Sequence, residues 1–512
     1  MTKPPNILLI TSDQQHWNTL GTTNPRICTP ALDRLAREGT TFTRAYCPNP
    51  TCSPTRASLI TGQYPSRHGC WAIGVGLPEN VPTVGDALTR VGYATGLIGK
   101  AHFQPLTSTP EAPSIECQPL LRDLDYWRRF KGDWYGFQHV ETARMHGFES
   151  HAGQHYAIWM EENGLANWQD YFQQWPPNPD DKYARGRYLR GGMTWDLPER
   201  FHHSHWVGER TCTHIEDAVA ADRPFFLWSS FFDPHPPYVI PEPWSSMYDP
   251  ADMEIGRFVE GEMASMPRHH RLTRETSPDF SDWNEPGGQG VHGFHSHLHS
   301  ETEMRRSMAI YYGMIGLMDA NIGRILDTLD AQGVANNTLV VFTSDHGHFL
   351  GQHGLIAKGP FHYEDVIRVP MIVRHPGKVS AGARSATLQS LVDFPQTFLS
   401  AAGCEIPRVM QGVDQLDAWH GSAHGVRDWA MVENRHNPTT VHLRTLITDR
   451  YKLTLYRGTA EGELFDLETD PDETRNLFHA RDHAKVRSNL MHRFLQAEME
   501  RESSPMARVA GA

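Results

Sequence analysis

Residues 5–11 read PNILLIT, and this run decides the fold class. It is apolar throughout and as long as one strand, which is typical of a strand buried on both faces. A helix pattern with a capping threonine, a proline and a closing glycine follows in TPALDRLAREG (29–39). VPTVGDALTRVG (81–92) repeats that design, and YATGLIGK (93–100) follows as another strand. This alternation predicts an α/β fold with a mostly parallel sheet flanked by helices.

The pattern returns in the second half of the chain. RPFFLWSSFF (223–232) and NTLVVFTSD (337–345) read as further buried strands, with a long helix near 303–332 between them. Two segments, at about 105–210 and 240–300, are rich in Trp, Tyr, His and Pro and have little periodicity. They predict long inserted loops and inserted elements over one edge of the sheet, where substrate specificity usually lies.

The tail differs from the rest. From about residue 425 the runs alternate between apolar and polar residues, which predicts a small antiparallel sheet, and a final helix is expected near 482–501. We therefore predict a catalytic domain at 1–424 and a smaller α+β subdomain at 425–512.

Composition excludes several classes of function. The 512 residues carry a net charge of −13 without a basic stripe, which argues against nucleic acid as a partner. No run of about 18 apolar residues indicates a membrane span, and the start lacks a signal-peptide cleavage site. Seven cysteines, an odd number, do not form a disulfide framework. We expect a cytoplasmic protein without a membrane partner.

A histidine tract at 291–300, VHGFHSHLHS, is the first candidate metal site. Its histidines have no carboxylate or cysteine nearby in the sequence, so an exposed loop is the preferred interpretation. They are His292, His295, His297 and His299.

Residues 51–62, TCSPTRASLITG, carry a more specific pattern. A proline two residues after Cys52 suits the first turn of a helix. Arg56 lies four positions after Cys52, so both side chains would point from one helix face. A nucleophile and a cation at the positive end of a helix form a layout that holds an anion. Taken alone, Cys52 fits better as a small buried side chain without a catalytic role.

Acidic residues follow two of the predicted strands. Asp13 comes after the first strand, and Asp345 with His346 comes after TLVVFTS. Ligands bind beyond the carboxyl ends of the strands in such sheets, and two carboxylates with an imidazole suit a divalent metal ion. Each segment is also a good turn sequence, so the alternative is a pair of strand-end turns.

Together these motifs make the chain resemble the type I sulfatases of the alkaline phosphatase superfamily. The signature C-x-P-x-R is present at 52–56, and NILLITSDQ, GKAHF, DPHPP, TSDHG and IAKGP occur in the family's order. The resemblance spans nearly the whole chain. It implies an alkaline-phosphatase-like fold, a large mostly parallel sheet flanked by helices with a smaller C-terminal antiparallel sheet plus helix.

The resemblance implies that Cys52 is oxidised to formylglycine by a maturation enzyme. The hydrated aldehyde offers one hydroxyl as the nucleophile and a second that later expels sulfate, which splits one difficult step into two. One divalent metal ion would assist. Its implied ligands are Asp13, Asp345, His346 and the group at position 52, with Gln14 as a weaker ligand.

The implied catalytic residues surround that ion. Asp345 would also be the base for the nucleophile, and Arg56 would hold the diol. Lys100 and His102 would contact the diol, with His102 as the base that expels sulfate. His235 and Lys358 would bind sulfate and assist the leaving oxygen, since fixed cations around a transferring group supply much of catalysis.

Two departures keep alternatives open. Many sulfatases have Asp-Asp and Asp-Asn where this chain has Asp13-Gln14 and Asp345-His346. The ion would be Ca²⁺, with Mn²⁺ as the alternative because an imidazole replaces an oxygen ligand. The pair is similar to the branch that contains arylsulfatases and phosphonate monoester hydrolases, and choline sulfatases are near. Lys100 and His102 favour the sulfatases.

The preferred function is hydrolysis of aryl or small organic sulfate monoesters, with promiscuity toward phosphonate monoesters. The alternatives are a phosphonate monoester or phosphodiester hydrolase, a choline sulfatase, or an inactive scaffold if Cys52 is never converted. The expected partners are a small sulfate or phosphonate ester, the maturation enzyme and further copies in a dimer or tetramer. Five aromatic residues could line an aryl or quaternary-ammonium pocket or simply pack: Trp127, Trp134, Tyr135, Trp195 and Trp206.

Overall fold

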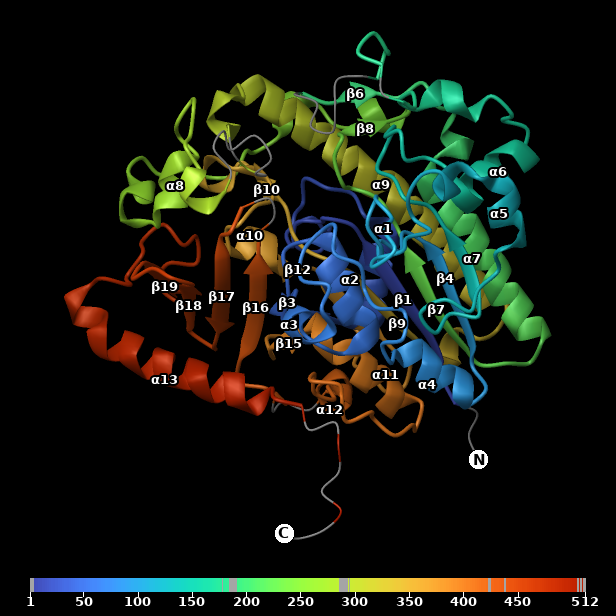
Figure 1. The fold of residues 1–512 in the computed structure, drawn as a ribbon. Helices are drawn as coiled ribbons and strands as arrows, with labels where there is room; N and C mark the ends of the chain where they lie inside the picture. Colours follow the sequence, from blue (N-terminus) through green and yellow to red (C-terminus); the bar gives the residue numbers. More distant parts are fainter. Residues whose placement is uncertain are drawn as a thin grey trace.

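A large central sheet covered by helices and a smaller sheet beside it make up the fold (Figure 1). The computed structural model describes residues 4–176, 178–183, 191–284, 293, 295–421, 425–436, 439–503, 506 and 509.

The central sheet has eight strands within the described part of the chain. From edge to edge they are β14 (Ala383–Ser385), β2 (Thr40–Phe42), β13 (Met371–Arg374), β9 (Thr338–Ser344), β1 (Asn6–Ser12), β7 (Phe225–Ser230), β4 (Ala94–Gly99) and β5 (His139–Thr142). The run β9–β1–β7–β4–β5 is parallel, and β13 is antiparallel to β9. The mostly parallel sheet predicted from the first strand is confirmed.

Both faces of the sheet are buried, as the apolar run of β1 predicts. Ile7 and Leu9 pack on one face with α2 (Cys52–Thr61), α4 (Val84–Arg90) and α11 (Phe394–Ala401). Leu8 and Ile10 point to the opposite face, which is covered by α1 (Pro30–Glu38), α7 (His203–Ala220) and α9 (Glu301–Ala331). Because helices cover both faces of the sheet, a ligand can approach these strands only at their ends.

The inserted segments are more ordered than their sequences indicate. The segment at 105–210 contributes strand β5 to the central sheet, as well as α5 (Leu124–Arg129), α6 (Gln154–Glu162) and the start of α7. The segment was predicted to hold long loops and inserted elements; β5, which has four residues, is too short to show periodicity in the sequence. The segment at 240–300 fits the prediction better, since α8 (Arg268–Leu272) is its one α-helix among the described residues.

A four-stranded antiparallel sheet follows near the C-terminus. Its strands are β16 (Ala430–Arg435), β17 (His442–Ile447), β18 (Tyr451–Tyr456) and β19 (Gly462–Asp466). Helix α13 (Ala484–Glu500) packs on it through Leu490, Phe494 and Ala497. The predicted small antiparallel sheet with one helix is confirmed, whereas the domain limits at 424 and 425 stay a prediction.

Short elements connect these parts. They are β3 (Ala45–Tyr46), α3 (Pro65–His68), β6 (Met193–Thr194), β8 (Val239–Ile240), β10 (Phe349–Leu350), β11 (Ile356–Ala357), α10 (Glu364–Ile367), β12 (Arg368–Val369), β15 (Gln389–Ser390) and α12 (Leu416–Trp419).

Three sequence predictions concern residues away from the sheet. His292 of the histidine tract lies outside the described residues, and its other three histidines are half-buried rather than exposed. All seven cysteines are free thiols. Among the described helices, none is both long and apolar enough to cross a membrane.

The end of β4 needs glycine. Gly99 has φ +103°, and a Cβ there would lie 1.9 Å from the carbonyl oxygen of Ser230 on the adjacent strand. Gly92 has a similar φ of +94°, with open space around the corresponding position. We expect Gly99→Ala to lower the free energy of unfolding by about 1–3 kcal/mol more than Gly92→Ala, because the extra clash adds to a shared backbone strain. Urea unfolding of both variants measures this, and equal losses would contradict it.

Candidate active site

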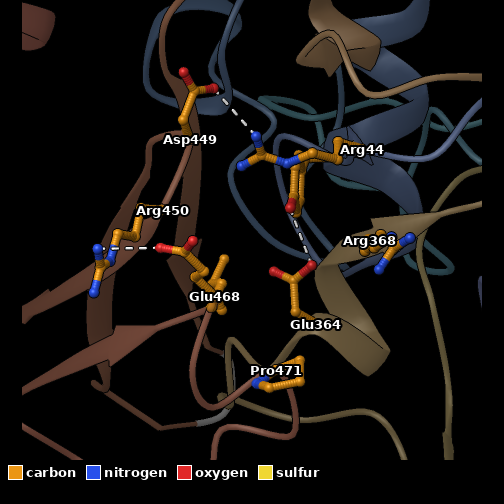
Figure 2. A pocket seen from close by; sticks show the side chains of 9 residues that line it. Arg44, Glu364, Arg368, Asp449, Arg450, Glu468 and Pro471 are labelled. Atoms are coloured by element: carbon orange, nitrogen blue, oxygen red, sulfur yellow. Dashed lines mark hydrogen bonds and ion pairs between the residues drawn. The ribbon is translucent and has the colours of Figure 1, made fainter.

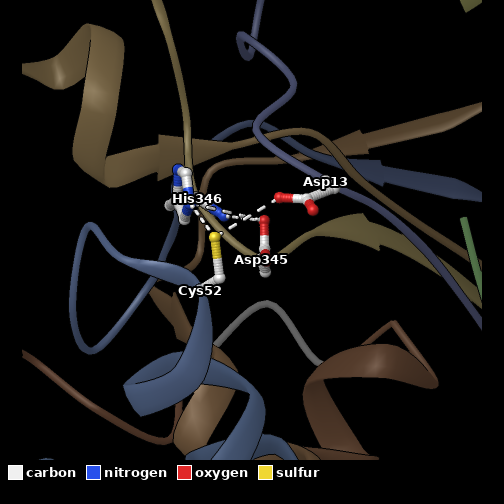
Figure 3. Close-up of side chains that lie close together, drawn as sticks. All are labelled: Asp13, Cys52, Asp345 and His346. Carbon is white, nitrogen blue, oxygen red and sulfur yellow. Dashed lines mark hydrogen bonds and ion pairs between the residues drawn. The ribbon is translucent and has the colours of Figure 1, made fainter. Parts of the chain in front are cut away.

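Four side chains converge at the carboxyl ends of β1 and β9. Asp13 and Asp345 directly follow these two strands, His346 is next in the chain, and Cys52 enters from the start of α2 (Figure 3). Their ligand-type atoms all lie within 4.8 Å of one another, and all four residues are buried. The strand-end residues therefore meet around Cys52 as the topology predicts.

The start of α2 is firmly fixed. Cys52 is the first helical residue, Thr51 is the extended N-cap, and every residue of the helix is buried. Thr51 Oγ1 and Thr55 Oγ1 each donate a 2.5 Å hydrogen bond to Asn49. The Asn49 amide in turn donates to the backbone carbonyl of Glu433 in β16, at 2.6 Å. The C-terminal sheet thus helps to hold Cys52 in place.

Arg56 lies about one helical turn after Cys52 in α2, on the helix face predicted by the four-residue spacing. Its Nε donates to Asp345 Oδ2 at 2.9 Å, and its Nη1 donates to Lys100 O at 2.9 Å and to Ser230 Oγ at 2.7 Å. Its Nη2 lies 3.8 Å from Asp13 Oδ2 and has no hydrogen-bond partner within the described chain. Arg56 therefore links α2 to both carboxylates, and the two N–H groups of its Nη2 have no hydrogen-bond acceptor among the described residues.

The oxygen and nitrogen atoms of this cluster fit a divalent metal ion. His346 Nδ1 lies 3.0 Å from the carbonyl of Gly347, to which it can only donate. That bond leaves the lone pair on Nε2, which lies 3.3 Å from Cys52 Sγ. Gln14 Oε1 is buried and accepts no hydrogen bond from any described residue. Two carboxylates, one imidazole nitrogen and this amide oxygen are a suitable donor set.

Two lysines belong to this cluster, one in contact with Cys52 and the other in contact with Asp13. Lys358 Nζ lies 3.2 Å from Cys52 Sγ and 3.4 Å from His235 Nε2, and it also contacts His346 Nε2 at 3.2 Å. Lys100 Nζ forms a short ion pair with Asp13 Oδ2. Sequence reasoning placed all of these residues in one site, and the structure brings them together.

The charges of this cluster shift its pKa values. Burial and Asp13 would raise the pKa of the Cys52 thiol, but the two lysines and His346 bring it down to about 7. Burial would likewise raise the pKa of Asp13, yet Lys100 beside it holds that pKa well below its usual value. A carboxylate that stays ionised inside the protein is what a metal ligand requires.

His102 is placed differently from the other predicted residues. Its Nε2 lies 2.5 Å from Arg144 Nη2, and its backbone amide donates to Glu116 Oε1 at 3.0 Å. Burial lowers its pKa well below the usual value. Its Nδ1 has no hydrogen-bond partner among the described residues, and its described contacts do not include Cys52.

Sequence reasoning missed several residues of the site. His146 Nε2 lies 2.6 Å from Lys100 Nζ, and its ring stacks on His235 with centroids 3.6 Å apart. Arg144 and Glu116 surround His102. These three residues belong to the inserted segment at 105–210, and HGFES (146–150) carries no spacing or motif that could reveal a role. Ser230, at the end of β7, was also missed.

The five aromatic residues singled out in the sequence and the cavity beside the small sheet do not belong to this cluster. The five aromatic residues singled out in the sequence are at most 4% exposed, so they pack in the interior. A cavity of about 540 Å³ lies between Arg44 and Arg368 of the main domain and Arg450 of the small sheet (Figure 2). Its lining residues include none of the predicted site residues.

Comparison with known proteins identifies a family for this chain. The family model "Sulfatase" matches residues 5–404, and the model "N-sulphoglucosamine sulphohydrolase, C-terminal" matches residues 351–500. The chain is 29% identical over 509 residues to an uncharacterized sulfatase, YidJ, of Escherichia coli (strain K12), which covers 98% of this chain and 88% of that relative.

A second relative and a solved structure point the same way. An arylsulfatase of Clostridium perfringens (strain 13 / Type A) is 27% identical over 510 residues, which covers 97% of this chain and 94% of that protein. The solved phosphonate monoester hydrolase of Agrobacterium radiobacter superposes with a TM-score of 0.78 at 25% identity, over 97% of this chain and 96% of that one.

Proposed function

The chain belongs to the sulfatase family of the alkaline phosphatase superfamily, and we propose that it hydrolyses sulfate monoesters of aryl or other small organic alcohols. The observation that carries the proposal is the convergence of Cys52 Sγ with Asp13, Asp345, His346 and Lys358 in one buried cluster. A nucleophile, anionic ligands and a cation at one point are the parts that transfer of a sulfuryl group needs.

We assign the nucleophile to position 52. In the proposed mature enzyme Cys52 is formylglycine, whose hydrate supplies one hydroxyl to attack sulfur and a second whose deprotonation expels sulfate. The side chain points toward Asp13 Oδ1, 3.6 Å from Cys52 Sγ, and toward His346. Asp345, which Arg56 holds in place, is the proposed base for the attacking hydroxyl. His102 remains the candidate base for the second step.

A divalent ion, Ca²⁺ or alternatively Mn²⁺, would be held by Asp13, Asp345 and His346 with Gln14 as a further oxygen donor. When bound it lowers the pKa of a hydroxyl at position 52 and polarises the ester oxygens. The chain's own side chains would hold the sulfate. Lys358 Nζ contacts both Cys52 Sγ and His235 Nε2, and we propose that Lys358 and His235 bind sulfate and support the departing oxygen.

We expect Asp345→Asn to weaken metal retention by 10-fold or more, since removing one charged ligand lowers the attraction for a divalent ion and frees Arg56. Measurement of bound metal after dialysis against a chelator tests this, with Asp327→Asn on the surface of α9 as the control. Chelation should lower the activity of the wild-type protein in parallel. Full activity in protein shown to be metal-free would contradict the prediction.

A phosphonate monoester hydrolase is the second candidate. It is favoured by the structural similarity to the hydrolase of Agrobacterium radiobacter and by the imidazole of His346 in the ligand set. Sulfate and phosphonate monoesters both present a tetrahedral centre with one negative charge, so one site can accept both.

A direct comparison of substrates separates the two candidates. Protein co-produced with a maturation enzyme is assayed on an aryl sulfate and an aryl phosphonate monoester that share one leaving group. We expect a higher kcat/KM for the sulfate, because Lys100 and His102 favour the sulfatases and Lys358 Nζ contacts Cys52 Sγ. A wide margin for the phosphonate would replace the first candidate with the second.

A further inference from the structure

A histidine–glutamate pair from the inserted segment stands beside Lys100. His146 Nε2 lies 2.6 Å from Lys100 Nζ and 3.6 Å from Asp13 Oδ2. On the other side of the ring, Nδ1 lies 2.9 Å from Glu149 Oε2. His146 is 2% exposed and Glu149 is 7% exposed, so water does not compete with these contacts.

The two neighbours of His146 fix its tautomer. The ammonium group of Lys100 can only donate hydrogen bonds, so Nε2 must be the acceptor. The carboxylate of Glu149 accepts, so Nδ1 must carry the proton. The ring is therefore neutral and oriented by Glu149, in the manner of a carboxylate that sets the tautomer of a metal-ligating histidine.

This arrangement determines where Lys100 can point. An ammonium group has three donors, and two of them are directed at His146 Nε2 and at Asp13 Oδ2. With two directions fixed, the direction of the third N–H follows from tetrahedral geometry. The same imidazole stacks on His235 at a centroid distance of 3.6 Å and an interplanar angle of 19°. The His146 ring thus contacts both Lys100 and His235, two residues of the candidate site.

We propose that His146 and Glu149 are positioning residues, which orient Lys100 and His235 toward the sulfuryl group of the substrate. The proposal deepens the proposed function, on which it rests, and assigns a role to the segment at 143–149 that follows β5. It accounts for a buried carboxylate–imidazole pair that contacts none of Cys52, Asp345 or His346 among its described contacts.

The test is a set of single substitutions read out by steady-state kinetics. We expect His146→Leu, which removes the acceptor, to lower kcat/KM by about 10–100-fold, as loss of an orienting partner typically does. His146→Gln can present an amide oxygen to Lys100 and should recover part of this loss. The kcat/KM of Glu149→Gln should lie between those of His146→Leu and His146→Gln. The inhibition constant of inorganic sulfate should rise in the same order, which a merely structural defect would not produce.

Two controls make the result decisive. His151 also approaches Glu149 Oε2, at 3.8 Å, but is partly exposed, and His151→Gln should leave kcat/KM within about threefold of wild type. In a double-mutant cycle, adding His146→Leu to Lys100→Met should cost less than adding it to wild type, because most of its effect passes through Lys100. Fully multiplicative losses, or a His146→Leu enzyme within threefold of wild type, would overturn the proposal.

The series is measured on both aryl sulfate and aryl phosphonate esters. If the enzyme prefers phosphonates, the proposed function fails, while the order of the variants on the preferred ester still reports on His146. Should His146→Leu fold poorly by circular dichroism, Glu149→Gln and His146→Gln carry the same comparison.

Discussion

Replacing Cys52 with alanine is expected to abolish ester hydrolysis while the fold remains intact. The substitution removes the thiol that the maturation enzyme would oxidise, so no aldehyde forms at position 52, and loss of a nucleophile typically costs about 10⁴-fold or more in kcat. Cys52 is buried at the start of α2, where alanine is smaller and a good helix former, so the helix should still form. Steady-state assays with a sensitive aryl ester measure the loss, and circular dichroism checks the fold.

The matched control is Cys28→Ala, since Cys28 is exposed and lies outside the site. Peptide mass spectrometry of the wild-type protein should find an aldehyde at position 52 and unmodified thiols at the other cysteines. A Cys52→Ala enzyme with near-normal rates would contradict the mechanism. If the enzyme is active while Cys52 is an unmodified thiol, position 52 stays part of the proposed site but formylglycine does not.

The sequence predicts the central part of the site because that part is tied to regular elements. Asp13 and Asp345 follow apolar strands, and parallel strands bring their carboxyl ends to one edge of the sheet. Arg56 shares a helix face with Cys52 because of its spacing. For Lys100, His235 and Lys358 the residue types alone say little, and it was the resemblance to sulfatases that singled them out.

The remainder could not be predicted for physical reasons. His146 lies in irregular backbone after a four-residue strand, where neither a period of 2 nor one of 3.6 can develop. Its role depends on contacts with residues 46 and 89 positions away, Lys100 and His235, which no local pattern reports. The five aromatic residues could not be assigned from the sequence either, because aromatic residues that pack in the core and aromatic residues that line an aryl pocket give the same composition.

His102 shows a limit of inference from motifs. GKAHF predicted that Lys100 and His102 both contact the diol, and the structure pairs Lys100 with Asp13. In the described structure the His102 ring turns to Arg144, and its backbone at φ +60° is held by Glu116. Both partners come from the inserted segment, so the environment of this histidine depends on residues that the motif does not include.

Replacing Lys358 with alanine is expected to lower kcat for sulfate esters by about 10²–10³-fold, which is the usual cost of losing one preorganised donor at a site of developing charge. Lys358 Nζ contacts Cys52 Sγ, His346 Nε2 and His235 Nε2. Among the described contacts, no other lysine of the site reaches these three groups, so none is expected to replace Lys358. The loss should be larger for esters with poor leaving groups, because the leaving oxygen then carries more charge in the transition state.

The measurement is kcat for a series of aryl sulfates that differ in the acidity of the leaving phenol. Lys378→Ala, which removes an exposed lysine, is the control. Because Lys358 also lowers the pKa of the Cys52 thiol, conversion to formylglycine must be quantified in each preparation, so that incomplete maturation is not read as slow chemistry. A uniform loss across all leaving groups would assign Lys358 to sulfate binding alone, and a change below threefold would remove it from the catalytic set.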